Sequence, residues 1–313
     1  MSTDIGDTPL IVQFASRDPV EAVNAGRVVQ DMCCAVDMNL GCPQQCARKG
    51  GYGAFLMSEP DLVYSIVAAL HRELSVPVTC KIRIYPPEEG GLEQTIKFAR
   101  ELHAHGCQVK CSGDTSYAAH SGQMLCVHGR TKYMKGPLLG RADWEAIAAV
   151  RRALPEIPMI ANGSVYTYED AQQALHISGC DAIMAADGIL QNPYLFAGPT
   201  EQYPVNPLKQ FNEYLSIAEA MQTPRRFIAM HAQYLLAPLW DRVPHLRSVV
   251  TSVKELGQWR EFITRVDTEL MKGSVPAEYL AEAELLDQKK QHKKQHIGAD
   301  LESLACLEVF ENE

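Results

Sequence analysis

The chain has 313 residues, of which 46% are hydrophobic and 21% charged, and its formal net charge at pH 7 is -9. This length allows one large domain and a smaller one, and the composition is that of a globular protein. The negative net charge argues against a general nucleic-acid binder, and no apolar run is long enough to span a membrane. We therefore expect an intracellular protein of the cytoplasm or the nucleus.

Six short segments rich in β-branched residues recur along the first part of the chain, and each ends in polar residues or glycine. They are residues 10–13, 35–39, 78–83, 124–130, 158–163 and 182–188. Segments with helical spacing of apolar residues lie between most of them, for example 62–70 and 144–154. Strands that alternate with helices predict an α/β fold with a parallel sheet, and polar strand ends favour a TIM (β/α)8-type barrel with its site at those ends.

From about residue 207 the pattern becomes entirely helical. Apolar residues in 227–239 and 246–256 have helical spacing, and the stretch 224–265 holds seven Lys or Arg against three Asp or Glu. Such a local basic stretch could bind RNA although the whole chain is acidic. We predict a barrel domain over 1–206, a small all-helical domain over 207–272 and a charged, helix-prone tail over 273–313.

Cys42 is the main candidate for a catalytic residue. An apolar run ends in the turn Asn39-Leu40-Gly41-Cys42-Pro43, and a glycine-rich loop follows at 50–53. A thiol with an ordinary pKa of about 8.5 holds a proton at neutral pH and can still release it. The alternative is a buried thiol that acts only as a small hydrophobe. Cys46 lies one helical turn away, but two ligands do not make a metal site.

Charged side chains end the next two strands. Lys81 lies between Cys80 and Ile82, and a lysine in an apolar strand is unfavourable unless it meets an anion. Arg83 alternates with Lys81 and could bind phosphate or carboxylate, or form a structural salt bridge. The triplet His128-Gly129-Arg130 ends the following strand, where a bound ligand explains it better than packing does.

The last two strands end in Asn162-Gly163-Ser164 and Ala186-Asp187-Gly188. Loops after the last two strands of a barrel often cradle a phosphate with their backbone N–H groups, although each triplet alone is also typical of an ordinary turn. Gly163 would permit close approach of such a ligand.

A possible zinc motif also occurs, with His103, His105, Cys107 and Cys111 in the pattern H-x-H-x-C-x3-C. The two histidines are two residues apart on a helical pattern, so their side chains point to different faces. We therefore predict no metal site.

Together these motifs closely resemble the tRNA-dihydrouridine synthase family. The Gly-Cys-Pro turn, Gly-Tyr-Gly-Ala, Cys-Lys-Ile-Arg, His-Gly-Arg-Thr-Lys and Ala-Asn-Gly occur in the family's order, and the resemblance extends to about residue 270. Segments 50–56, 76–83 and 128–137 look most like the eukaryotic enzymes that modify tRNA positions 16 and 17. The resemblance implies reduction of uridine to 5,6-dihydrouridine in tRNA through FMN, with NADPH as the reductant, and a helical domain across which tRNA lies.

By this resemblance, Cys42 would donate a proton to uracil C5 while reduced flavin delivers a hydride to C6. Contacts to the flavin are implied for Gln13, Asn39, Lys81, His128, Asn162, Gly163, Ser164, Ala186 and Asp187. Many bacterial members have Gly-Arg where this chain has Ala186-Asp187, so only backbone contacts to the phosphate carry over there. Contacts to the substrate are assigned to Arg83, Arg130, Arg225 and Arg226.

The chain departs from the family pattern in two places. The family's first two barrel strands would precede Met1, so we expect a barrel that is incomplete at the N-terminus. Residues 109–123 are rich in Ser and Gly, and we expect them to form an exposed inserted loop.

Two other functions stay open. One is an RNA-binding remnant of the family with impaired catalysis, and the other is an FMN oxidoreductase for small molecules, against which the basic helical stretch argues.

Overall fold

The computed structural model describes residues 8–106, 124–198, 206–250, 252–253 and 255–272. These residues form two compact units, one made of 8–165 and 169–185 and the other of 166–168 and 186–272. The expected loop at 109–123 and the charged tail at 273–313 lie outside the described residues. The domain limits that we drew at 206, 207 and 272 rest on sequence character and stay predictions.

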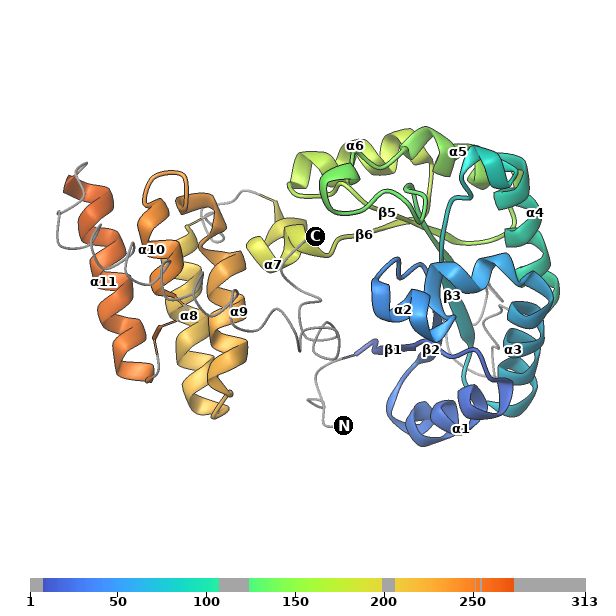
Figure 1. Ribbon diagram of the computed structural model, residues 1–313, viewed down its shortest axis with the longest axis horizontal. Helices are drawn as coiled ribbons and strands as arrows, with labels where there is room; N and C mark the ends of the chain where they lie inside the picture. The colour runs from blue at the N-terminus through green and yellow to red at the C-terminus, as the bar shows by residue number, and fades with distance from the viewer. Residues whose placement is uncertain (1–7, 107–123, 199–205, 251, 254, 273–313) are drawn as a thin grey trace. The chain divides into compact units, whose positions relative to one another are not determined.

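All six predicted strands occur in the first unit. They are β1 (Ile11–Phe14), β2 (Ala35–Leu40), β3 (Val78–Arg83), β4 (Leu125–His128), β5 (Met159–Asn162) and β6 (Ala182–Met184). They form one parallel sheet in the order β1-β2-β3-β4-β5-β6 (Figure 1). A (β/α)8 barrel has this sequential order, whereas a doubly wound sheet reverses direction at a switch point. The predicted barrel-type fold is confirmed, with six strands among the described residues.

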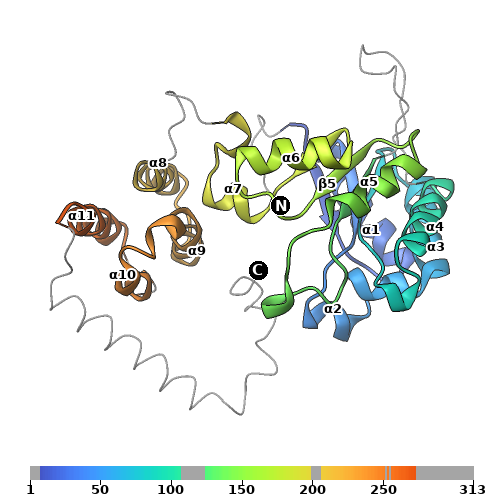
Figure 2. The same cartoon turned by 90° about the horizontal axis from the view of Figure 1, so that it is seen from above.

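Helices form an arc outside the curled sheet (Figures 1 and 2). They are α1 (Pro19–Val29), α3 (Pro60–Glu73), α4 (Gly91–Ala104), α5 (Trp144–Ala153) and α6 (Tyr168–Ser178), whereas the short α2 (Gln45–Gly50) lies in the connection between β2 and α3. Two of these helices begin after an acidic residue that caps the helix N-terminus. The Asp18 carboxylate accepts hydrogen bonds from the backbone N–H groups of Val20 and Glu21, and Asp143 accepts one from Ala146, so acidic caps begin α1 and α5.

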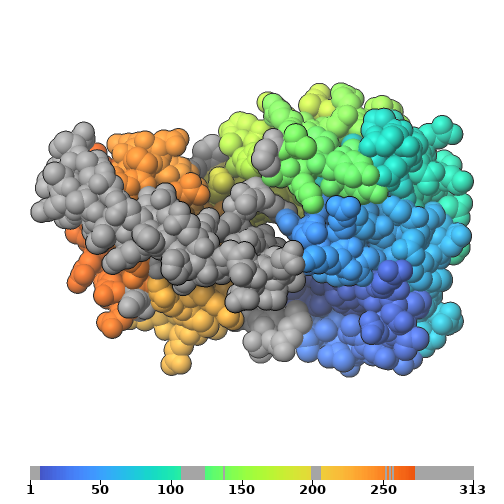
Figure 3. Space-filling model, in the orientation of Figure 1, coloured from blue at the N-terminus to red at the C-terminus, as the bar shows by residue number. Residues whose placement is uncertain are grey.

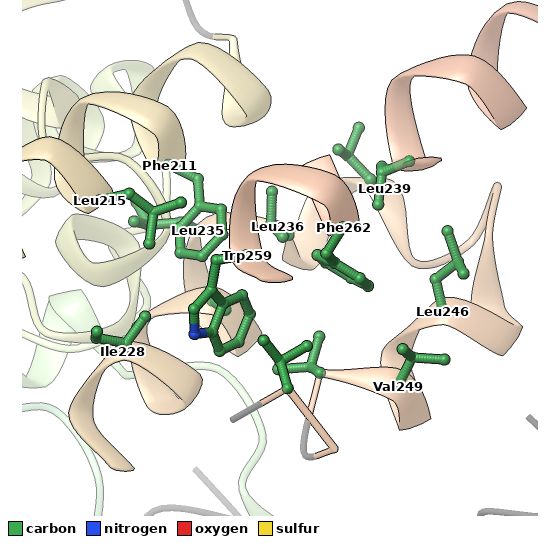
Figure 4. Packing of buried hydrophobic residues seen from close by; sticks show 14 of the residues in the cluster. Phe211, Leu215, Ile228, Leu235, Leu236, Leu239, Leu246, Val249, Trp259 and Phe262 are labelled. Atoms are coloured by element: carbon green, nitrogen blue, oxygen red, sulfur yellow. The ribbon is translucent and has the colours of Figure 1, made fainter. Parts of the chain in front are cut away.

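The second unit is helical, as predicted. Its helices are α7 (Asp187–Gln191), α8 (Pro207–Ala220), α9 (Arg225–Leu235), α10 (Pro244–Val249) and α11 (Leu256–Lys272). Its core is built around Trp259, whose ring meets Phe211 and Phe262 edge-on (Figure 4). No helix in the described part of the chain is long and apolar enough to cross a membrane.

One helical segment is shorter than the apolar spacing predicts. The predicted helix at 246–256 ends as α10 at Val249, because the backbone N–H and the hydroxyl of Ser252 both bond to the Val249 carbonyl. A serine that bonds locally to the backbone offers it an alternative to the helical ladder. A new helix, α11, then begins at Leu256.

Candidate active site

The alternation of side chains along the strands separates two faces of the sheet. The face beneath the helices is apolar and buried, with Val36, Met38, Leu40, Val78, Cys80, Ile82, Leu125, Val127, Met159 and Ala161. The opposite face, which we call the polar face, carries Gln13, Asp37, Asn39, Thr79, Lys81, Arg83, Cys126, His128 and Asn162. The register between strands therefore brings together five of the predicted flavin contacts, namely Gln13, Asn39, Lys81, His128 and Asn162.

Cys42 lies just beyond the end of β2, in a turn held from several sides. The Asn39 side-chain oxygen accepts hydrogen bonds from the backbone N–H groups of Gly41, at 3.0 Å, and Cys42, at 2.8 Å. Arg83 donates to the Gly41 carbonyl at 2.6 Å, and Lys135 donates to the Pro43 carbonyl at 2.9 Å. The Cys42 side chain is half-buried. Helix α2, which comes next in the sequence, lies on the surface seen in Figure 3. Cys42 is thus a positioned thiol rather than part of the hydrophobic core.

Gly53 explains why a glycine-rich loop follows this turn. Its φ of 62° lies in the left-handed region, and a Cβ there would come within 2.7 Å of the Cys42 carbonyl oxygen and 2.9 Å of the Cys42 Cβ. The Ala54 N–H bonds to the same Cys42 carbonyl at 3.0 Å. Only glycine lets the loop pack this closely against the cysteine.

Asp37 and Thr79 are polar-face residues that our sequence analysis missed. Asp37 is 8% exposed and accepts hydrogen bonds from the Thr79 hydroxyl at 2.6 Å and from the Gln13 amide at 2.7 Å. Burial raises the pKa of Asp37, while these two donors and the charge of Lys81 act in the opposite direction. The sequence did contain an indication of Asp37, because a carboxylate inside an apolar strand is as unusual as Lys81, which we singled out.

Arg83 and Arg130 are both buried. Each guanidinium group already donates hydrogen bonds to oxygen atoms of the protein. Arg83 bonds to the carbonyls of Gly41 and Thr131, whereas Arg130 bonds to the Gly140 carbonyl and, at 2.8 Å, to the Ser164 hydroxyl. Both side chains tie loops at the strand ends together. The contacts to substrate that we assigned to them stay predictions.

His128 is held neutral by its surroundings. Burial and the positive charges of Lys81, Arg83 and Arg130 lower its pKa to about 2. The Arg130 guanidinium lies 3.4 Å from the His128 Nε2 atom. Arginine can only donate, so this geometry favours the tautomer whose proton is on Nδ1.

This neutrality predicts a pH dependence of stability. The unfolded chain takes up a proton at His128 as the pH falls through about 6.5, and the folded protein does not. Stability attributable to His128 is therefore fully present above that pH and is lost below it. Relative to a His128→Gln variant, the parent should lose about 2 kcal/mol of unfolding free energy between pH 7 and pH 5, measured by urea denaturation.

The His128→Gln variant keeps every other titratable group of the chain, so its own pH dependence is the control for this measurement. An equal slope for the parent and His128→Gln would mean that His128 is protonated in the folded protein.

The turn after β5 is built around contacts within the protein. Gly163 has a φ of 108°, and a Cβ there would come within 2.8 Å of the Ala142 Cβ and 3.1 Å of the His128 Nε2. Ser164 also has a positive φ, of 57°, and its hydroxyl accepts a hydrogen bond from the Ala142 N–H. The close neighbours that require glycine at 163 are therefore protein side chains, and the predicted contacts of Asn162, Gly163 and Ser164 with a ligand stay predictions.

The remaining predicted site residues belong to the helical unit. Ala186 precedes α7, and Asp187 is its first residue. Arg225 and Arg226 begin α9 and are exposed, with Arg225 donating to the Val253 carbonyl and Arg226 lying 4.7 Å from the Phe227 ring centre. Their contacts with a phosphate or with RNA stay predictions.

The histidine and cysteine string of the possible zinc motif is only partly described. His103 lies on α4, whereas His105 follows that helix and stacks on Tyr64, with ring centres 4.9 Å apart. Cys107 and Cys111 lie outside the described residues. Within the described part of the chain, no group of three or more His, Cys, Asp or Glu could hold a metal ion.

Comparison with known proteins identifies the family. The chain is 39% identical to the tRNA-dihydrouridine(16/17) synthase [NAD(P)(+)]-like protein of Rattus norvegicus over 254 residues, which are 80% of this chain and 52% of that protein. It is 35% identical to the tRNA-dihydrouridine(16/17) synthase [NAD(P)(+)] of Saccharomyces cerevisiae over 83% of this chain and 59% of that protein. A human tRNA-dihydrouridine(20a/20b) synthase [NAD(P)+]-like protein is 31% identical over 77% of this chain and 68% of that protein.

The chain spans about half the length of the first of these relatives. A family model described as dihydrouridine synthase (Dus) matches residues 1–112 and 113–288, which covers both described units. The order of motifs and the sequential parallel sheet agree with this match. The chain belongs to the dihydrouridine synthase family.

Proposed function

We propose that this protein reduces uridine to 5,6-dihydrouridine in tRNA, at positions 16 and 17, with FMN as its cofactor and NADPH as the reductant. The observation that carries the proposal is the location of Cys42, in a fixed turn at the carboxyl end of β2 and next to the polar face. The more similar relatives are named for positions 16 and 17 and for NAD(P). Its substrate would be found in the cytoplasm or the nucleus.

The polar face has the chemistry that a flavin ring requires. Asp37 is the only carboxylate on the six described strands, and Lys81, Arg83 and Arg130 surround the neutral His128. This excess of positive charge suits a cofactor whose reduced ring is anionic near N1 and O2. Gln13 and Asn39 add amide groups, which can form hydrogen bonds with the polar edge of a planar ring. We assign FMN to this face, with its phosphate near the ends of β5 and β6.

FMN, when bound, would supply the hydride that the pyrimidine ring accepts. The residues of the chain have the complementary tasks. The Cys42 thiol donates a proton to C5 of the uracil, and Asn39 holds the backbone of that cysteine in place. The uridine must leave its stack to reach a site at the strand ends. The basic stretch that begins at Arg225 and Arg226 gives the helical unit a surface for the tRNA backbone.

The proposal is tested by incubating the protein with FMN, NADPH and an unmodified tRNA transcript and analysing the nucleosides by mass spectrometry. We expect dihydrouridine to form at positions 16 and 17. If the protein binds tRNA but neither retains FMN nor produces dihydrouridine, the alternative of an RNA-binding protein with impaired catalysis is correct.

Lys81→Ala should weaken FMN binding. Lys81 lies opposite Asn39 of β2 and Cys126 of β4 in the strand register, so it is near the centre of the polar face. Loss of one charged contact to an anionic ligand corresponds to about tenfold weaker binding or more. Titration of the apoprotein with FMN, followed by quenching of flavin fluorescence, measures the change.

Lys97→Ala is the matched control, because Lys97 is exposed on α4 and its replacement removes the same charge away from the polar face. The control should bind FMN as the parent does. Equal affinities for the parent and Lys81→Ala would exclude Lys81 as a flavin contact.

A further inference from the structure

A continuous chain of hydrogen bonds runs across the polar face from β3 to the Cys42 turn. The Thr79 hydroxyl donates to one oxygen of Asp37 at 2.6 Å, and the Gln13 amide nitrogen donates to the other at 2.7 Å. The Gln13 oxygen then accepts from the Asn39 amide nitrogen at 2.8 Å. The Asn39 oxygen finally accepts from the backbone N–H groups of Gly41 and Cys42. Three strands and the cysteine turn are thereby joined.

The direction of every bond in this chain is fixed at both ends, by the Asp37 carboxylate and by the backbone N–H groups of Gly41 and Cys42. An ionised carboxylate can only accept, so Gln13 must present its NH2 group to Asp37 and its oxygen to Asn39. Asn39 must then present its own NH2 group to Gln13, which leaves its oxygen for the Cys42 N–H. If Gln13 were flipped, Asn39 would have to flip too, and its NH2 group would face two backbone donors.

The location of Asp37 is costly for the protein, which argues for a function. Its carboxylate is buried among strands, and burial raises its pKa. It makes hydrogen bonds to two side chains of its own face. A hydrophobic residue would pack there without the cost of desolvation. An apolar residue could not accept from the Gln13 amide, so nothing at that end of the chain would favour this orientation of the two amides.

We propose that Asp37 is a positioning residue that sets the amide orientation of Gln13 and Asn39 and, through them, holds the turn that carries Cys42. Its relevance to catalysis rests on the proposed function, in which Cys42 donates the proton and Gln13 contacts the flavin. The positioning itself is a property of the protein without cofactor or substrate.

The test first breaks the hydrogen bond between positions 13 and 37 and then restores it with donor and acceptor exchanged. Gln13→Glu places two carboxylates against each other, at atoms now 2.7 Å apart, and breaks the chain. In the double variant Gln13→Glu/Asp37→Asn, the new amide at position 37 donates to the new carboxylate at position 13. The other oxygen of that carboxylate still accepts from Asn39, so the directions that reach the Cys42 turn are those of the parent. Asp37→Asn alone completes the double-mutant cycle.

The readout is the rate at which iodoacetamide alkylates Cys42 in the apoprotein, measured on the Cys42 peptide by mass spectrometry. Because Cys42 is half-buried, loosening its turn should speed the reaction. We expect Gln13→Glu to accelerate alkylation about tenfold or more, and the double variant to return to within about threefold of the parent. Cys34, which is exposed, is the internal control and should react equally in all variants.

Thr79→Val keeps the side-chain shape and removes only one donor to Asp37, so it tests the same chain if Gln13→Glu fails to fold. It should accelerate Cys42 alkylation about fivefold at an unchanged Cys34 rate. Additive effects of Gln13→Glu and Asp37→Asn, or an unchanged Cys42 rate in Thr79→Val, would overturn the positioning role. If either of these results occurs while the parent forms dihydrouridine normally, only the positioning role is wrong and the proposed function stands. If the double variant restores the Cys42 alkylation rate but the parent forms no dihydrouridine, only the proposed function is contradicted.

Discussion

Cys42→Ala is expected to abolish dihydrouridine formation and to leave FMN bound. Removal of a general acid typically lowers turnover by about 10²–10⁴-fold. The backbone of the turn forms hydrogen bonds with the Asn39 side chain, the Arg83 side chain and the Ala54 N–H, and the thiol takes part in none of these three, so the substitution should leave the turn in place. Nucleoside analysis under single-turnover conditions measures the rate, and flavin absorbance after gel filtration measures the retained cofactor.

Cys46→Ala is the matched control for this experiment. Cys46 is also half-buried and follows Cys42 by four residues, on α2. The control should retain the activity of the parent, which separates the proton donor from a general effect of losing a thiol. If Cys42→Ala reduced uridine within about twofold of the parent rate, Cys42 would not be the proton donor.

Trp259→Ala should have the largest effect on stability in the helical unit. The Trp259 side chain is 1% exposed, and its ring centre lies 5.5 Å from that of Phe211 and 5.9 Å from that of Phe262. The helices of this unit surround it (Figure 4). Truncation of a buried aromatic residue to alanine costs about 3–5 kcal/mol, because it loses both burial and packing. Urea unfolding followed by circular dichroism should show this loss in the helical transition.

Met271→Ala on the same helix is the control, because Met271 is 79% exposed. Its unfolding free energy should stay within about 0.5 kcal/mol of the parent. A loss of less than about 1 kcal/mol for Trp259→Ala would mean that the unit repacks around the cavity, and that Trp259 is not the centre of its core.

The strands and the Cys42 turn could be predicted from local sequence. Each predicted segment is a short apolar run that ends in polar residues or glycine, and this pattern needs no knowledge of the fold. The predicted segment 78–83 is β3 itself, and 35–39 is β2 without its last residue. Part of the Cys42 turn is equally local, because the Asn39 side chain bonds to N–H groups two and three residues further along the chain.

The partners of the polar side chains could not be predicted, because they come from residues distant in the sequence. Arg83 meets Gly41, which is 42 residues away, and this contact requires the register of β2 with β3. Asp37 is unusual in its own strand and could have been noticed, but its partners Gln13 and Thr79 lie on other strands and could not be predicted. The reason for glycine at position 163 is likewise tertiary, since the atoms that exclude a Cβ belong to Ala142 and His128.

The most direct test of the account is a single-turnover reaction on the polar face. The protein loaded with FMN is reduced with NADPH under anaerobic conditions and then mixed with unmodified tRNA. We predict that one dihydrouridine appears for each flavin reoxidised, and that a transcript with cytidine at positions 16 and 17 leaves the flavin reduced. A flavin that stays reduced with the native transcript, or one that is reoxidised without dihydrouridine, would contradict the assignment of this face as a uridine-reducing site.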